Sequence, residues 1–100
     1  MELRQSDVRA APELVAPEDF TALKVVVDGD RDEALRRLSR AGVTGDAEHV
    51  WIPAGLLRTL AGGAVNPDWE ASMSRMIAYA LSRGWYDERR AAVRAHLEYL

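Results

Sequence analysis

The chain has 100 residues, a net charge of −3 and no cysteine, and these properties exclude several classes of protein. The length suits one domain that can bury a core without disulfides, and the absence of cysteine rules out thiolate metal sites. No apolar run is long enough to cross a membrane, and the acidic balance argues against nonspecific binding of nucleic acid. Lys24 is the only lysine among 13 basic residues, an arginine bias typical of GC-rich bacterial genomes. We therefore expect a bacterial, cytoplasmic protein.

The first 15 residues show no sustained hydrophobic period, and Pro12 and Pro17 interrupt the stretch. Proline removes a backbone donor and restricts its neighbour, so regular structure is disfavoured around it. We expect an irregular N-terminal arm over residues 1–15, followed by a single helical domain over residues 16–100.

Residues 17–28 permit two interpretations. Val25, Val26 and Val27 in succession favour a buried strand, because β-branched residues fit a pleated surface. Against this, Pro17 followed by two acidic residues resembles the first turn of a helix, and apolar residues recur at helical spacing up to Gly29. We favour the helix, since a strand here lacks an obvious partner, and leave the strand as the alternative.

The stretch from residue 30 to residue 41 predicts a second helix. Asp30 is a candidate N-cap, and Glu33 follows three residues later in a capping-box pattern. Four residues line one face and Gly42 ends the run: Ala34, Leu35, Leu38 and Ala41. Carboxylates precede arginines by four residues at Asp32 and Glu33, which favours ion pairs along the helix.

A connector over residues 43–52 follows, with turn residues at Gly45 and Asp46 and a short extended segment at 49–52. Pro53 then opens a third helix, which the glycines at 62 and 63 end. Its inward face consists of three leucines: Leu56, Leu57 and Leu60.

Residues 66–85 carry the clearest helix signals in the chain. Asn66 is a good N-cap, Pro67 suits the first helical position, and Gly84 suits the left-handed conformation that follows a helix. One continuous apolar stripe connects these ends and contains Trp69, Met73, Met76, Ile77 and Ala80. We expect this to be the central helix of the fold.

A last helix is predicted over residues 87–99, with Asp87 as its cap. Val93, Leu97 and Leu100 form an apolar side, whereas Arg94 and Glu98 lie in a narrow polar arc. Together these elements predict an all-α fold, a compact bundle of about five short helices with short connections.

The sequence contains no motif that assigns a catalytic, cofactor-binding or metal-binding residue. His49 and His96 are the only histidines and lie 47 positions apart, and the acidic run from Asp28 to Asp32 lacks the glycine and glutamate of a calcium loop. His96 and Arg89 interrupt the broad apolar arc of the last helix, which leaves open whether they are functional or structural. We predict no catalytic residue, no cofactor and no metal.

Three tryptophans are the most unusual feature of the composition: Trp51, Trp69 and Trp85. We expect Trp69 and Trp85 to pack against the two ends of the central helix and Trp51 to close the connector over it, since aromatic side chains bury large areas. The leading functional hypothesis is a small non-enzymatic protein-interaction module that binds a protein partner or a second copy of itself. The alternative is a small-molecule-binding or enzyme accessory subunit with an apolar groove lined by Trp and by Met73 and Met76. Nucleic-acid binding is the least favoured hypothesis.

Overall fold

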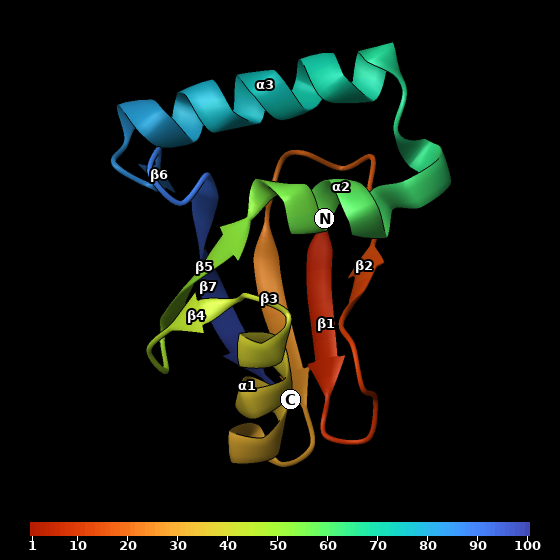
Figure 1. The fold of residues 1–100 in the computed structure, drawn as a ribbon, viewed down its shortest axis with the longest axis vertical. Helices are drawn as coiled ribbons and strands as arrows, with labels where there is room; N and C mark the ends of the chain where they lie inside the picture. The colour runs from red at the N-terminus through yellow and green to blue at the C-terminus, as the bar shows by residue number, and fades with distance from the viewer.

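A computed structural model describes all 100 residues and shows a seven-stranded mixed sheet with three α-helices (Figure 1). The strands are β1 (Glu2–Ser6), β2 (Glu13–Val15), β3 (Lys24–Asp28), β4 (Thr44–Gly45), β5 (His49–Pro53), β6 (Tyr86–Asp87) and β7 (Ala92–Tyr99). The helices are α1 (Arg31–Arg40), α2 (Ala54–Ala61) and α3 (Pro67–Ser82), with a short 3-10 helix η1 (Gly62–Ala64) before α3. The predicted all-α bundle is therefore wrong, and the fold is mixed α/β.

The strands lie in the order β2-β1-β3-β7-β5-β4, and β6 pairs with the first residues of β7. β1, β3 and β7 run parallel to one another, whereas β2, β5 and β6 run antiparallel to the strands they pair with. β7 has three strand partners and is central to the sheet.

None of the three α-helices combines the length and apolar character needed to span a membrane.

The predicted last helix over residues 87–99 is instead β6 and β7. Val93, Ala95 and Leu97 are buried, whereas Arg94 and His96 between them are exposed, which is the two-residue alternation of a strand. Alanine, arginine and glutamate are good helix formers, but pairing on both sides of β7 outweighs that local preference.

The helix preferred for residues 17–28 is also wrong, and the strand alternative is correct for its second half. β3 lies between β1 and β7, and Val25, Val26 and Val27 are all at most 3% exposed. Residues 1–15, which were expected to form an irregular arm, contain two strands. β1 is the parallel partner of β3, and β2 pairs antiparallel with β1. The Met1 amino group donates to the carbonyls of Asp19 (2.6 Å) and Ala22 (3.1 Å), which anchors the start of β1.

Several helix signals are confirmed. The Asp30 carboxylate accepts a hydrogen bond from the Glu33 amide at 2.9 Å, and the Asn66 side chain accepts one from the Trp69 amide at 2.8 Å. At the end of α3, Gly84 has a φ of 76° and the Trp85 amide donates to the carbonyl of Ala80 at 2.8 Å, as in a Schellman motif. The extended segment expected at 49–52 is β5.

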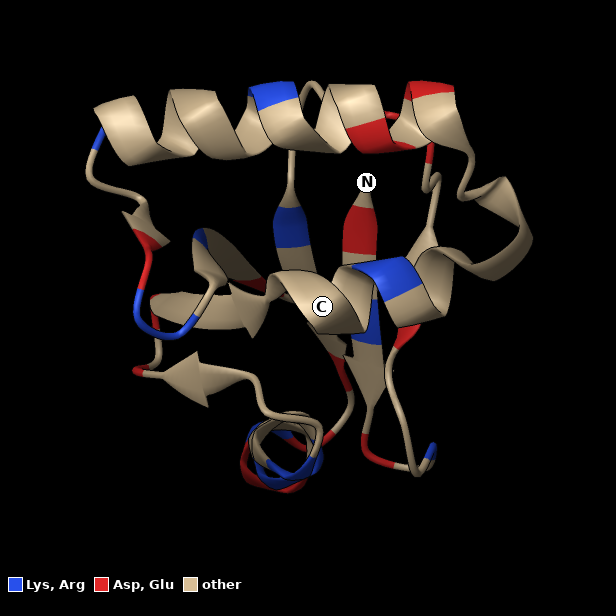
Figure 2. Cartoon of the chain, turned by 45° about the horizontal axis from the view of Figure 1, so that its top comes forward, with Lys and Arg blue, Asp and Glu red and all other residues tan.

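The helices leave one face of the sheet uncovered. α1 and α2 pack on the same face, and the buried core there contains Leu3, Val25, Leu38 and Leu57. α3 crosses the end of the sheet at which β1 and β3 begin (Figure 1), and its acidic residues gather in its first turn (Figure 2). The opposite side, which we call the open face, carries the alternate strand residues Glu2, Arg4, Lys24, Val26, His49, Trp51, Arg94, His96 and Glu98.

Candidate binding groove on the open sheet face

The two histidines, remote in sequence, are direct neighbours on the open face. His49 of β5 lies opposite His96 of β7 in the antiparallel register, and their ring centroids are 4.2 Å apart with the rings tilted by 44°. Lys24 of β3 lies on the other side of His96 in the same row. None of the four imidazole nitrogens makes a hydrogen bond within the protein, so all of them are free for an external group.

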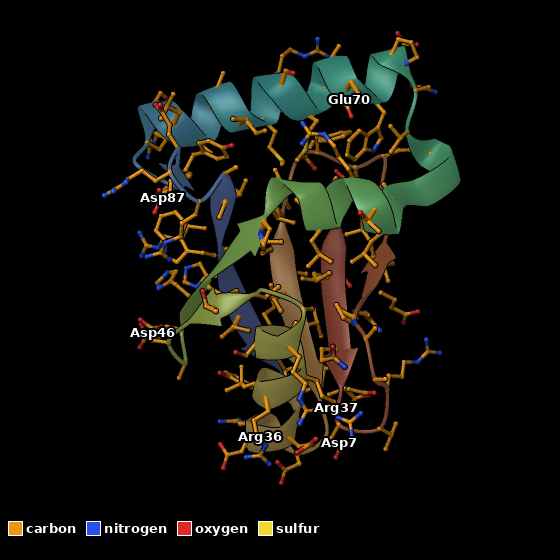
Figure 3. The ribbon with its side chains drawn as sticks, viewed as in Figure 1. Asp7, Arg36, Arg37, Asp46, Glu70 and Asp87 are labelled. Carbon is orange, nitrogen blue, oxygen red and sulfur yellow. The ribbon has the colours of Figure 1, made fainter.

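Asp46 fixes the turn that presents His49. Its carboxylate accepts hydrogen bonds from the amides of Glu48 (2.8 Å) and His49 (2.9 Å), and its own amide donates to the carbonyl of His49 (2.9 Å). Figure 3 shows Asp46 at this turn between β4 and β5. The amide of His49, followed by that of Glu48, holds the pKa of the Asp46 carboxyl below its ordinary value, because both hydrogen bonds favour the charged form.

The titration of Asp46 gives a testable pH dependence. A carboxyl whose pKa is lower in the folded state stabilises the protein fully above its unfolded pKa, and this stabilisation is lost as the pH falls through the folded value. We expect the difference in Tm between wild type and Asp46→Asn to be constant above about pH 5 and to shrink below about pH 4. Thermal melts across this range, with the exposed Glu88→Gln as the control, measure it. A difference that stays constant to the lowest pH would contradict the assignment.

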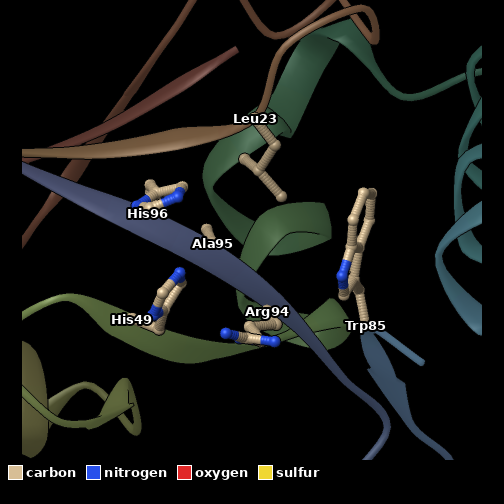
Figure 4. Close-up of a pocket in the computed structure, with 6 residues that line it drawn as sticks. All are labelled: Leu23, His49, Trp85, Arg94, Ala95 and His96. Atoms are coloured by element: carbon tan, nitrogen blue, oxygen red, sulfur yellow. The ribbon is translucent and has the colours of Figure 1, made fainter. Parts of the chain in front are cut away.

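A hollow of about 220 Å³, which we call the histidine hollow, lies beside the histidine pair. Figure 4 shows the two imidazoles and, across the hollow, the indole of Trp85. Its lining residues are Leu23, His49, Trp85, Arg94, Ala95 and His96. Since the charged or titratable members are an arginine and two histidines, with no carboxylate, the lining suits an anionic group.

A second hollow of about 140 Å³, which we call the tyrosine hollow, adjoins the first and is largely apolar. It is lined by Phe20, Thr21, Leu23, Met76, Tyr79, Ala80, Trp85, Val93 and Arg94. Leu23, Trp85 and Arg94 line both hollows, so the two adjoin along these residues, and we call the pair the groove.

The position of Trp85 follows from the way α3 ends. Gly84 reverses the chain after the helix, and the Trp85 amide bonds back to α3, so the indole returns over the last turn. There it meets Tyr79 edge to face at 6.0 Å, and the Arg83 guanidinium lies 5.1 Å from the indole centroid. The indole remains 37% exposed, and Tyr79 is 58% exposed, so both present aromatic surface to solvent.

Arg94 is the cation on the open face that has no carboxylate partner. Lys24 lies within 3.5 Å of Glu2 and 3.2 Å of Glu98, and Arg4 lies 3.0 Å from Glu2, so these charges are neutralised in place. The Arg94 side chain makes no ion pair and no hydrogen bond with the protein, although its backbone amide donates to the carbonyl of Trp85 at 2.8 Å. The positive charge of Arg94 is therefore available to a ligand.

The structure separates the other residues that the sequence singled out. Trp69 is buried at the N-terminal end of α3, whereas Trp51 is half-buried on the open face beneath Arg90, whose guanidinium lies 5.8 Å from the Trp51 ring centroid. Arg89 lies in the turn before β7 and lines neither hollow. Met73 belongs to the core, and Met76 lines the tyrosine hollow. The sequence prediction did not place Arg94 in a candidate site, although the alternation of buried and charged residues along β7 could have indicated its position on the open face.

The chain matches no known protein family, and no characterised protein or solved structure is significantly similar to it.

Proposed function

We propose that this protein is a non-enzymatic binding module whose groove takes a segment of a protein partner that carries a large apolar side chain beside a carboxylate. The observation that carries this proposal is the pair of adjoining hollows. The tyrosine hollow is largely apolar, and Arg94, a cation with no carboxylate partner, lines both hollows. Exposed aromatic residues with a nearby arginine are the usual composition of interface hot spots. The absence of cysteine leads us to place this module in the cytoplasm.

The charges of the open face favour an acidic peptide over a nucleic acid. Glu2 and Glu98 lie on the same face as the groove, and a phosphate backbone passing across the sheet would meet both of them. A single carboxylate can reach Arg94 without approaching either. The sheet edges are poor docking sites, because β2 has three residues and β4 has two, which limits strand addition from a partner or a second copy.

Selection from a library of linear peptides displayed on phage tests the proposal. We expect the enriched sequences to share a large apolar residue within a few positions of Asp or Glu. Such a peptide, labelled for fluorescence anisotropy, should bind about tenfold or more weakly to Arg94→Gln, because a charge-assisted hydrogen bond contributes about 1.5–3 kcal/mol. Trp85→Ala should weaken binding as well, since it removes the wall common to both hollows.

Arg75→Gln is the matched control, because Arg75 is exposed on α3 and lines neither hollow. This variant should bind the selected peptide like wild type. Enrichment of basic sequences, or equal binding by Arg94→Gln, would overturn the proposal. Tighter binding of octathymidylate than of the peptide, lost in Arg94→Gln, would instead assign the groove to single-stranded nucleic acid. Saturation by an apolar small molecule such as indole-3-acetate, with no enriched peptide, would assign it to a small ligand.

A further inference from the structure

We propose that His49 and His96 form a two-histidine site for one divalent transition-metal ion of the class that prefers imidazole, namely Cu²⁺, Ni²⁺ or Zn²⁺. The two histidines line the histidine hollow, but the inference does not require that the groove binds a peptide. It is carried by the direct cross-strand placement of the two residues and by the four ring nitrogens, which are all without a protein partner.

The geometry requires little movement of either side chain. When two imidazoles bind one ion through nitrogens at about 2.0–2.1 Å, their ring centroids stand roughly 4.5–5.2 Å apart. The observed separation is 4.2 Å, and the 44° tilt already departs from parallel stacking. A small outward rotation of the two rings, of which His49 is half-buried and His96 exposed, is sufficient to place an ion between one nitrogen of each. The backbone need not move, because the register of β5 and β7 fixes both Cα atoms.

The surroundings set the strength and the coordination of this site. No group of three or more potential ligands occurs anywhere in the protein, so water completes the coordination sphere. The ammonium group of Lys24 is held by Glu2 and Glu98, which lowers its repulsion of a bound cation. Arg94 remains unpaired two residues from His96, and its charge opposes the ion. The Asp46 carboxylate accepts a hydrogen bond from the backbone amide of His49, and its negative charge favours the ion.

Isothermal titration of the protein with CuCl₂, NiCl₂ and ZnCl₂ tests the inference, provided that any polyhistidine tag is removed. We expect one ion per chain with saturation below about 1 mM metal. Cu²⁺ should bind most tightly, following the Irving–Williams order, and Mg²⁺ should give no response. Because the chain has only two histidines, each single replacement, His49→Gln or His96→Gln, should weaken binding at least tenfold, and the double replacement should abolish it. Electron paramagnetic resonance of the Cu²⁺ form should show coupling to imidazole nitrogens.

Arg94→Gln distinguishes this site from the peptide groove. Removal of the guanidinium should strengthen metal binding, whereas the same replacement should weaken peptide binding. Binding that survives in the double histidine variant would overturn the metal site, as would an absence of saturation by any of the three ions. Neither result would affect the peptide experiment, which uses metal-free protein.

Discussion

Replacement of Trp69 by alanine is expected to lower the free energy of unfolding by about 3–5 kcal/mol, which is the usual cost of truncating a buried aromatic side chain. Trp69 is 4% exposed and belongs to the core between α3 and the sheet. Its ring meets Phe20 edge to face at 5.4 Å, and its indole nitrogen donates to the carbonyl of Pro17 at 2.8 Å. Alanine at this position leaves a cavity and an unpaired carbonyl, so both losses act together.

This effect would remove a large part of the stability of a domain that unfolds with about 5–15 kcal/mol. Urea denaturation followed by circular dichroism measures it. Trp69→Phe should cost less, because the ring is kept and only the bond to Pro17 is lost. The control is Trp85→Ala, whose indole is 37% exposed and whose loss should change stability far less. If the two tryptophan variants unfolded at the same urea concentration, the burial of Trp69 would be contradicted.

The local signals in the sequence predicted local structure well. Asp30 and Asn66 act within three residues of themselves, and Gly84 acts on the helix that it directly follows. These interactions need no distant partner, so they can be recognised along the chain. For this reason α1, α2 and α3 were predicted within a few residues of their observed ends.

The sequence pattern does not distinguish β7 from a helix, because the spacing of its apolar and charged residues fits both structures. Val93 and Leu97 lie four residues apart, and so do Arg94 and Glu98. A spacing of four places residues on one face of a helix, and it also places them on one face of a strand. Ala95 is the position that distinguishes a strand from a helix, because a strand buries it together with Val93 and Leu97. In the structure Ala95 is 4% exposed. Alanine is common on either face of a helix, so this signal was weak.

Misassignment of β7 also concealed the candidate site. With residues 87–99 as a helix, His96 has no relation to His49, and Arg94 lies with Glu98 in a narrow polar arc. The strand brings all four side chains to one groove, because His96 pairs with His49, 47 positions away in sequence, and the Arg94 amide bonds to the Trp85 carbonyl. Pairings at this separation depend on the whole sheet, so no short motif encodes them. The sequence did identify His96 as an interruption of an apolar pattern, but not the surface on which it lies.

Replacement of Leu57 by alanine is expected to lower the free energy of unfolding by about 2–5 kcal/mol. A helical bundle would place Leu56, Leu57 and Leu60 on one inward face with similar burial. Against a sheet only one of them is covered completely: Leu57 is 0% exposed in the core, whereas Leu56 and Leu60 are only partly buried. Leu57→Ala should therefore cost clearly more than Leu56→Ala or Leu60→Ala, because a cavity forms only where neighbours enclose the removed atoms.

Urea denaturation of the three leucine variants measures this ranking. Thr59→Ala is the matched control on the exposed side of α2, where alanine improves helix propensity and removes only a bond to the Gly55 carbonyl. Leu57→Met conserves volume and should cost less than about 1.5 kcal/mol, which separates cavity formation from a general intolerance of substitution. Equal losses for all three leucines would be the result of a helix with a broad inward face, and would contradict the packing of α2 on the sheet.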